Sequence, residues 1–86
     1  MPNILFTGDS FDQLMYWIKN DRKIAERIYK LANDIIRNGP DKGIGKPERL
    51  KHKPYWSRRI DDKNRLIYDM RENLLDIKHC KGHYDD

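Results

Sequence analysis

Chemistry-bearing side chains are concentrated in the segment KPERLKHKPYWSRRI, residues 46–60. Six Lys or Arg side chains and one histidine surround a single carboxylate there, Glu48. Cations interleaved with the aromatic residues Tyr55 and Trp56 are typical of a surface for single-stranded nucleic acid, because phosphates meet the charges and bases can stack. The pattern also fits a solvated basic face with Trp56 packed in the core. Glu48 is then either a surface carboxylate paired with a neighbouring cation or a general base.

A second group of reactive side chains lies near the C-terminus. His79, Cys80 and His83 fall within five residues, but the CxxC spacing of structural zinc sites is absent and no fourth ligand is evident. On a strand, His79 and Cys80 point to opposite faces. We therefore expect no metal site, and we expect Cys80 to be a small buried apolar residue. His83 and Tyr84 form either a frayed tail or a pair that transfers protons and hydrogen-bonds phosphate.

Size and composition restrict the class of protein. The 86 residues, 37% apolar and 37% charged with a formal net charge of +4, predict one domain, residues 1–86, with a small core. No apolar run approaches the ~20 residues of a membrane helix, and MPNILFTGDS is not a signal peptide. GxSxG, HExxH and glycine-rich phosphate-loop motifs are absent. With a single cysteine, the chain fits a soluble cytoplasmic protein without membrane contact.

Periodicity predicts two helices after an N-terminal strand at residues 3–7. The first helix begins with a capping box of Ser10 and Gln13. Asn20 or Asp21 caps the second helix, which ends at Gly39, where a left-handed conformation is expected, and Pro40. The apolar stripe of the first helix is expected to be Phe11, Leu14, Met15 and Ile18. The stripe of the second helix is expected to be Ile24, Ile28, Leu31 and Ile35, with Ala25 and Ala32 alongside.

Four strands are predicted after the loop at residues 41–47, in the segments ERLKH, WSRRI, RLIYDM and LLDIKHC. This order favours an α+β fold, in which an antiparallel two-helix hairpin packs on one face of a mainly antiparallel sheet. If the DDKN hairpin has a three-residue loop, Arg59 lies directly opposite Arg65. Like charges so placed destabilise a sheet unless an anion lies between them.

The ordered motifs GKPERLKH, WSRRI, RLIY and a terminal HY, with SFDQLMYW near the N-terminus, resemble the YoeB (Txe/YoeB) family of bacterial toxins in the RelE-like superfamily. The resemblance covers nearly the whole chain and implies a RelE-like, microbial-RNase-like fold. It implies an mRNA interferase that cuts mRNA in the A site of the 70S ribosome, without metal or cofactor. Attack by the ribose 2′-hydroxyl would give a 2′,3′-cyclic phosphate and a 5′-hydroxyl. The implied partners are an acidic Phd/YefM-type antitoxin, operator DNA that is bound only through this antitoxin, and a second copy of the chain in a homodimer.

The resemblance also assigns roles to individual residues. Glu48 is the expected base for the 2′-hydroxyl, Arg65 the group that stabilises the phosphorane, and His83 the acid for the leaving 5′-oxygen. Tyr84 is expected to position the scissile phosphate. The remaining expected RNA or phosphate contacts are Arg59, Lys51, His52, Lys46 and Arg58.

Two features leave alternatives open. Asp85 and Asp86 extend the chain beyond the HY pair. Because carboxylates repel a phosphate, we expect them either to point outward or to reduce activity. The chain also fits a non-catalytic basic module that binds RNA or the ribosome, or a regulatory co-repressor that acts through a DNA-binding partner. Only the enzyme requires Glu48, Arg65 and His83 together, so loss of these residues separates the enzyme from the other two hypotheses.

Overall fold

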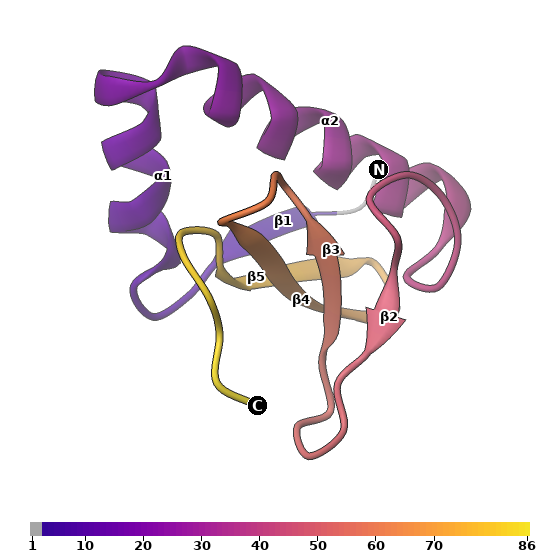
Figure 1. Ribbon diagram of the computed structural model, residues 1–86. Coiled ribbons are helices and arrows are strands. Elements are labelled where there is room, and N and C mark those ends of the chain that lie inside the picture. The colour runs from indigo at the N-terminus through magenta and orange to yellow at the C-terminus, as the bar shows by residue number, and fades with distance from the viewer. Residues whose placement is uncertain (1–2) are drawn as a thin grey trace.

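Two helices cover one face of a five-stranded sheet in the computed structural model, which describes residues 3–86 (Figure 1). The elements are β1 (Asn3–Phe6), α1 (Ser10–Asn20), α2 (Arg22–Asn38), β2 (Glu48–Arg49), β3 (Trp56–Arg59), β4 (Arg65–Arg71) and β5 (Leu74–His79). The strand order is β1-β5-β4-β3-β2, and every neighbouring pair is antiparallel except β1–β5, which is parallel. The predicted α+β fold with a mainly antiparallel sheet is confirmed.

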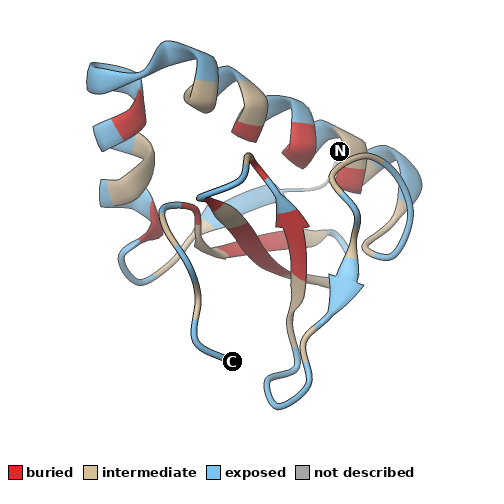
Figure 2. Cartoon of the chain, viewed as in Figure 1, coloured by how far each residue is buried: buried red, intermediate tan, exposed pale blue. Residues whose placement is uncertain are grey.

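Helix α2 supplies most of the helical side of the core. Ile28, Leu31, Ala32 and Ile35 are buried, and Ile24 and Ala25 are partly buried against them, so the predicted stripe is confirmed. The helix ends at Gly39, which has φ +96°, a value that L side chains rarely adopt. Figure 2 shows the buried residues of α2 facing the central strands, with the opposite side of the helix exposed.

Helix α1 is rotated relative to the prediction. Phe11, Met15 and Ile18 are exposed, whereas Trp17 is buried. The Trp17 indole Nε1 donates a hydrogen bond to the Cys80 carbonyl at 2.9 Å. A buried indole needs such a partner. This bond therefore determines that the side of α1 carrying Trp17 packs on the sheet.

The predicted capping box of Ser10 and Gln13 is wrong. Ser10 is the first helical residue, Asp9 is the N-cap, and no side-chain cap bond forms there. The Ser10 hydroxyl instead lies 2.7 Å from the Thr7 carbonyl and 2.8 Å from that of Ile77. Gln13 Oε1 accepts the Cys80 N–H at 2.7 Å. Both polar side chains therefore fasten the start of α1 to the segment at residues 77–80, which comprises the end of β5 and Cys80.

Arg58 is fully buried and is the largest such side chain in the described residues. Its Nε donates to Tyr68 Oη at 2.9 Å, and its Nη1 pairs with Asp34 Oδ2 at 2.5 Å. Its remaining donors reach the carbonyl groups of Gly39, Lys42 and Ile44. The expectation that Arg58 contacts RNA is therefore wrong, because strand alternation turns it toward α2 and its five donors are all used inside the protein.

The loop between α2 and β2 closes over this guanidinium. Gly43 has φ +123°, and a Cβ atom there would lie 1.8 Å from Asp34 Oδ2, so only glycine fits. Ile44 N–H donates to the same carboxylate oxygen at 3.0 Å. Burial opposes ionisation of Asp34, but the hydrogen bonds from Arg58 and Ile44 and the Arg58 charge outweigh it. The pKa of Asp34 is therefore below its ordinary value of 3.8.

We predict that Asp34→Asn lowers the free energy of unfolding by about 3 kcal/mol at pH 7, because it leaves a buried charge without its partner. The estimate is at the low end for a buried pair, since the Asp34 side chain keeps 17% exposure. A depressed pKa stabilises the fold above pH 3.8, and this contribution is lost as pH falls through the lower folded pKa. Denaturant titrations should show the deficit of the variant shrinking below pH 3.8.

The exposed Asp62 supplies the control, since it faces Arg59 at 3.9 Å with 98% of its side chain exposed. Asp62→Asn should change stability by under ~0.5 kcal/mol. An Asp34→Asn deficit that stayed constant down to pH 2 would contradict the assignment.

Candidate active site

The sheet face opposite the helices gathers charged side chains from β2, β3 and β4. Glu48 lies across from Ser57, and Arg59 lies across from Arg65. Ser57 and Arg59 are two residues apart on one strand, so all four share a face. Together with Lys46 they line a pocket of about 60 Å³. The structure thus brings together Lys46, Glu48, Arg59 and Arg65, four of the residues predicted for the site.

The pairing of Arg59 with Arg65 depends on the hairpin between them. Ile60 N–H donates to the Asn64 carbonyl at 3.0 Å, which leaves the three-residue loop 61–63 and confirms the predicted register. Asp61 Oδ1 accepts the N–H groups of Lys63 and Asn64 at 2.9 and 2.8 Å, an arrangement that favours a tight turn.

The charges of the pocket are poorly neutralised by the protein. Among the described residues, the Arg59 side chain pairs only with the exposed Asp62, at 3.9 Å, a contact that contributes little to stability. Arg65 Nη1 is buried and has no hydrogen-bond partner within residues 3–86. Glu48 is exposed and forms no ion pair with any residue that the structure describes. Two facing guanidinium groups with an unpaired buried donor favour binding of an anion.

Backbone contacts hold β2 and β3 against the core. Arg59 N–H donates to the Gly45 carbonyl at 2.7 Å. Gly45 has φ +82°, and a Cβ atom there would approach the Leu31 side chain to 2.9 Å. Arg49 covers the Trp56 ring at 5.5 Å, and Trp56 is partly buried against the core. The strand carrying Glu48 is thus fixed by the loop before it and by packing on Trp56.

The C-terminal tail is anchored beside the pocket. The Gly82 carbonyl accepts the Arg65 N–H at 3.2 Å and lies 3.1 Å from His79 Nε2. The Gly82 N–H donates to Asn64 Oδ1 at 2.7 Å. His83 follows directly and is exposed. These contacts contradict a frayed tail at Gly82. His83 is the next residue after Gly82, whose carbonyl is hydrogen-bonded to the Arg65 N–H.

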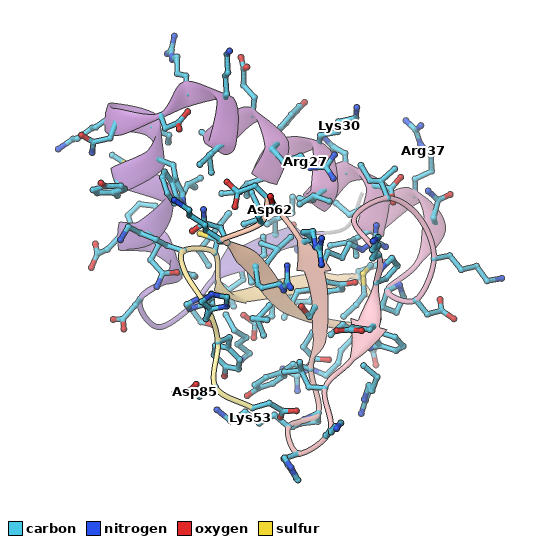
Figure 3. All side chains as sticks on the ribbon, in the orientation of Figure 1. Arg27, Lys30, Arg37, Lys53, Asp62 and Asp85 are labelled. Atoms are coloured by element: carbon cyan, nitrogen blue, oxygen red, sulfur yellow. The ribbon has the colours of Figure 1, made fainter. Side chains whose placement is uncertain are left out.

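Tyr84 bridges β5 and the loop at residues 50–55. Its ring centroid lies 5.2 Å from that of His79, and Lys53 Nζ lies 4.5 Å from the ring centroid and 3.3 Å from Tyr84 Oη. Figure 3 shows the labelled Lys53 and Asp85 where the tail approaches this loop. Lys51 and His52 are exposed on the same loop and do not line the pocket with Glu48.

Sequence reasoning missed Asn64 and His79 as supports of the tail. The cause at His79 is a β-bulge: Ile67 pairs with His79 but Tyr68 pairs with Ile77, so Lys78 is an extra residue. A bulge shifts the alternation of side chains by one, which turns His79 toward the tail while Cys80 is buried in the core. The expectation that Cys80 is a small buried apolar residue is confirmed. In the sequence, the three-residue spacing of Asp61 and Asn64 indicates the turn that holds Asn64.

Other chemistry finds little support. No group of three His, Cys, Asp or Glu side chains arranged for a metal ion occurs within residues 3–86. Burial raises the pKa of the Cys80 thiol to about 12, so it stays protonated and is a poor nucleophile. Among the described helices, none is long and apolar enough to cross a membrane.

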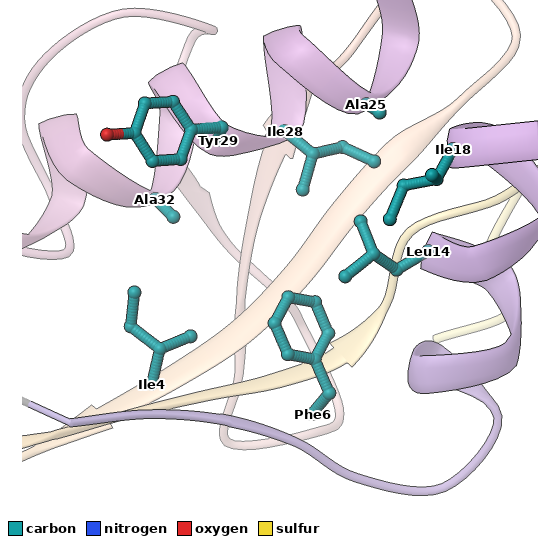
Figure 4. A pocket seen from close by; sticks show the side chains of 8 residues that line it. All are labelled: Ile4, Phe6, Leu14, Ile18, Ala25, Ile28, Tyr29 and Ala32. Atoms are coloured by element: carbon teal, nitrogen blue, oxygen red, sulfur yellow. The ribbon is translucent and has the colours of Figure 1, made fainter. Parts of the chain in front are cut away.

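A larger hollow lies between β1, α1 and α2 and has a volume of about 290 Å³ (Figure 4). Its lining is apolar apart from the Tyr29 hydroxyl, and consists of Ile4, Phe6, Leu14, Ile18, Ala25, Ile28, Tyr29 and Ala32. It carries no ionisable group suited to phosphate chemistry. The candidate active site is therefore the smaller charged pocket.

Comparison with known proteins identifies the family. The family model for YoeB-like toxins of bacterial type II toxin–antitoxin systems matches residues 6–84. A Toxin YoeB of Streptomyces coelicolor is 45% identical over 83 residues, which cover 94% of this chain and 98% of the relative. The heterotetrameric YoeB–YefM complex from Staphylococcus aureus is similar with a TM-score of 0.91 and 42% identity, covering 98% of this chain and 99% of that one.

A YoeB dimer from the same organism has a TM-score of 0.92 and 41% identity, covering 96% of this chain and 98% of that one. The fold, the order of the motifs and the nearly complete coverage agree. This chain belongs to the YoeB-like toxins of bacterial type II toxin–antitoxin systems.

Proposed function

We propose that this protein is a ribosome-dependent endoribonuclease that cleaves mRNA in the ribosomal A site and so inhibits translation. The observation that carries the proposal is the pocket shared by Glu48, Arg59 and Arg65, beside the anchored tail that carries His83. A carboxylate, two guanidinium groups and an imidazole are the groups that RNA cleavage by internal attack requires. The substrate supplies the nucleophile, so no cofactor is needed.

In the proposed reaction, Glu48 accepts the proton of the ribose 2′-hydroxyl as the 2′-oxygen attacks the adjacent phosphorus. Arg59 and Arg65 donate hydrogen bonds to the non-bridging oxygens as negative charge develops on the phosphorane. The bond from phosphorus to the 5′-oxygen then breaks, and His83 gives a proton to the leaving oxygen. The products are a 2′,3′-cyclic phosphate and a 5′-hydroxyl, with Tyr84 positioning the scissile phosphate.

The size of the pocket supports dependence on the ribosome. A volume of about 60 Å³ holds a phosphate group but is far below the ~300–1,000 Å³ of pockets that enclose whole small molecules. The site therefore has no enclosed space for a nucleobase. We propose that the ribosome presents the mRNA in the reactive geometry and that the protein therefore acts in the cytoplasm. We also propose that Lys46, Lys51 and His52 hold the RNA backbone.

Partners follow from the relatives. The Staphylococcus aureus structures are a YoeB–YefM complex and a YoeB dimer. We propose that this chain likewise pairs with an acidic Phd/YefM-type antitoxin, reaches operator DNA only through it, and forms a homodimer.

We predict that Glu48→Gln and His83→Gln each reduce mRNA cleavage by ~10²–10⁴, as loss of a base or an acid does. Arg65→Met should reduce cleavage by ~10²–10³, because it removes a donor to the phosphorane. The measurement is translation of a defined mRNA with purified protein, with cut sites mapped and rates compared. Lys30→Gln, an exposed cation on α2 (Figure 3), is the control and should retain full activity. Growth arrest on induction is the second readout, and unchanged growth arrest in all three site variants would favour the non-catalytic RNA-binding module or the co-repressor.

We predict that mRNA with a 2′-deoxyribose at the cut site resists cleavage, because it lacks the attacking oxygen. The wild-type products should carry a 2′,3′-cyclic phosphate and a 5′-hydroxyl, detected by end-specific labelling. EDTA at concentrations that spare ribosomal magnesium should leave the rate unchanged. Efficient cutting of the deoxy substrate would exclude internal attack, and strong inhibition by EDTA would support a metal site involving His79 and His83.

We predict that Arg65→Met leaves the free protein equally stable or up to ~1 kcal/mol more stable, because it removes the like charge opposite Arg59. Inorganic phosphate at constant ionic strength should raise the Tm of the wild type more than that of Arg65→Met. Arg37→Met, the same charge change on an exposed α2 residue, controls for non-specific anion effects. An equal phosphate response in all three proteins would show that the pocket does not bind the anion.

A further inference from the structure

The carboxylate of Asp86 is held by three consecutive backbone N–H groups. Lys51 N–H donates to Oδ2 at 2.5 Å, and His52 and Lys53 N–H donate to Oδ1 at 3.0 Å each. Consecutive N–H groups that converge on one anion form a nest, a backbone arrangement that binds phosphate as well as carboxylate. These amide groups hold the exposed Asp86 at the loop at residues 50–55, which does not line the pocket with Glu48.

The surroundings of this nest are cationic. Lys51, His52 and Lys53 all contribute side chains to the loop, and Lys53 Nζ also donates to the Asp85 carbonyl at 3.2 Å. Desolvation acts to raise the pKa of Asp86, but the three N–H donors and the charge of His52 outweigh it and lower that pKa below its ordinary value. The free protein thus holds an ionised group of its own in a site with the donors and the charge for an anion.

The nest lies close to the candidate active site along the chain. Gly82 is bonded to Arg65, and Asp86 is four residues further on, a span of at most ~14 Å for a fully extended chain. The loop that forms the nest directly follows the strand that carries Glu48. This spacing allows one RNA segment to contact both Arg65 and these amide groups.

We propose that the backbone N–H groups of Lys51, His52 and Lys53 are a second phosphate site for the RNA backbone, and that the Asp86 carboxylate competes with RNA for it. The proposal rests on the endoribonuclease function proposed above and adds the position of a non-scissile phosphate. A phosphodiester presents the same two acceptor oxygens as a carboxylate, and it gains attraction from the surrounding lysines. Binding of RNA at the nest requires Asp86 to leave.

Competition of this kind weakens RNA binding in proportion to how often Asp86 fills the nest. If the carboxylate is seated ~90% of the time, the apparent affinity falls about tenfold. Asp86→Asn keeps the size of the side chain but removes the charge that competes. A tail that served only as a structural strap would behave differently, because weakening it would loosen the loop and reduce RNA binding.

The test compares Asp86→Asn with Asp85→Asn, which makes the same charge change one residue earlier. Binding of a fully 2′-O-methylated RNA oligonucleotide, which cannot be cleaved, is measured by fluorescence anisotropy. We expect about threefold to tenfold tighter binding for Asp86→Asn and less than twofold change for Asp85→Asn. An equal increase in RNA affinity in both variants would show that only the net charge matters. Weaker RNA binding by Asp86→Asn would show that Asp86 serves to hold the loop in place. Either result overturns the proposal.

Amide chemical shifts report on the nest without any need for catalysis. In ¹H–¹⁵N spectra of Asp86→Asn, the oligonucleotide and inorganic phosphate should each shift the amides of Lys51, His52 and Lys53, and at lower concentration than in the wild type. If phosphate shifts them and the oligonucleotide does not, the nest is an anion site that RNA does not use, and the proposal fails. If neither shifts them while Glu48→Gln still abolishes cleavage, only the nest is refuted. If Glu48→Gln retains full activity, the proposed function fails whatever the shifts show.

Discussion

The buried guanidinium of Arg58 is the interaction on which the rest of the structure depends. It joins β3 to Asp34 of α2 and to the hydroxyl of Tyr68 on β4. A charge in the core is tolerated only when its donors are paired, so the loop after α2 must bring its carbonyl groups over the guanidinium. That loop leads directly into β2. The position of Glu48 on the opposite face is thus a consequence of how the core satisfies one arginine.

Arg58 and Arg59 are neighbours in sequence with opposite surroundings. Alternation along β3 sends one into the core and the other to the face of Arg65. A slip of one residue in the pairing would exchange the two arginines, and the guanidinium that then entered the core would be displaced along β3 from Asp34 and Tyr68. The buried network therefore fixes the register of β3, and that register sets two like charges against each other. Stability in the core offsets this repulsion on the face of the candidate active site, and the repulsion favours binding of an anion there.

The sequence predicts those features that follow from local period and turn chemistry. The stripe of α2, the order of the strands and the opposition of Arg59 to Arg65 belong to this class. The role of Arg58 does not, because a paired core arginine and a phosphate-binding arginine look alike without knowledge of Asp34, 24 residues earlier. Ser10 and Gln13 fit a capping box as well as they fit contacts with Ile77 and Cys80. The bulge at Lys78 leaves no mark on the hydrophobic pattern, so the placement of His79 could not be inferred.

The two ends of the C-terminal tail are held by different kinds of hydrogen bond. Gly82 is fixed by two partly buried contacts: its N–H donates to Asn64 Oδ1, and its carbonyl lies 3.1 Å from His79 Nε2. Within residues 3–86, the Asp86 carboxylate is held only by exposed amide groups. Exposed bonds with little packing around them open at low free energy. The tail can therefore release its acidic end while the segment just before His83 stays in register with Arg65. This division separates a fixed part next to the candidate chemistry from a part that gives way to an incoming polyanion.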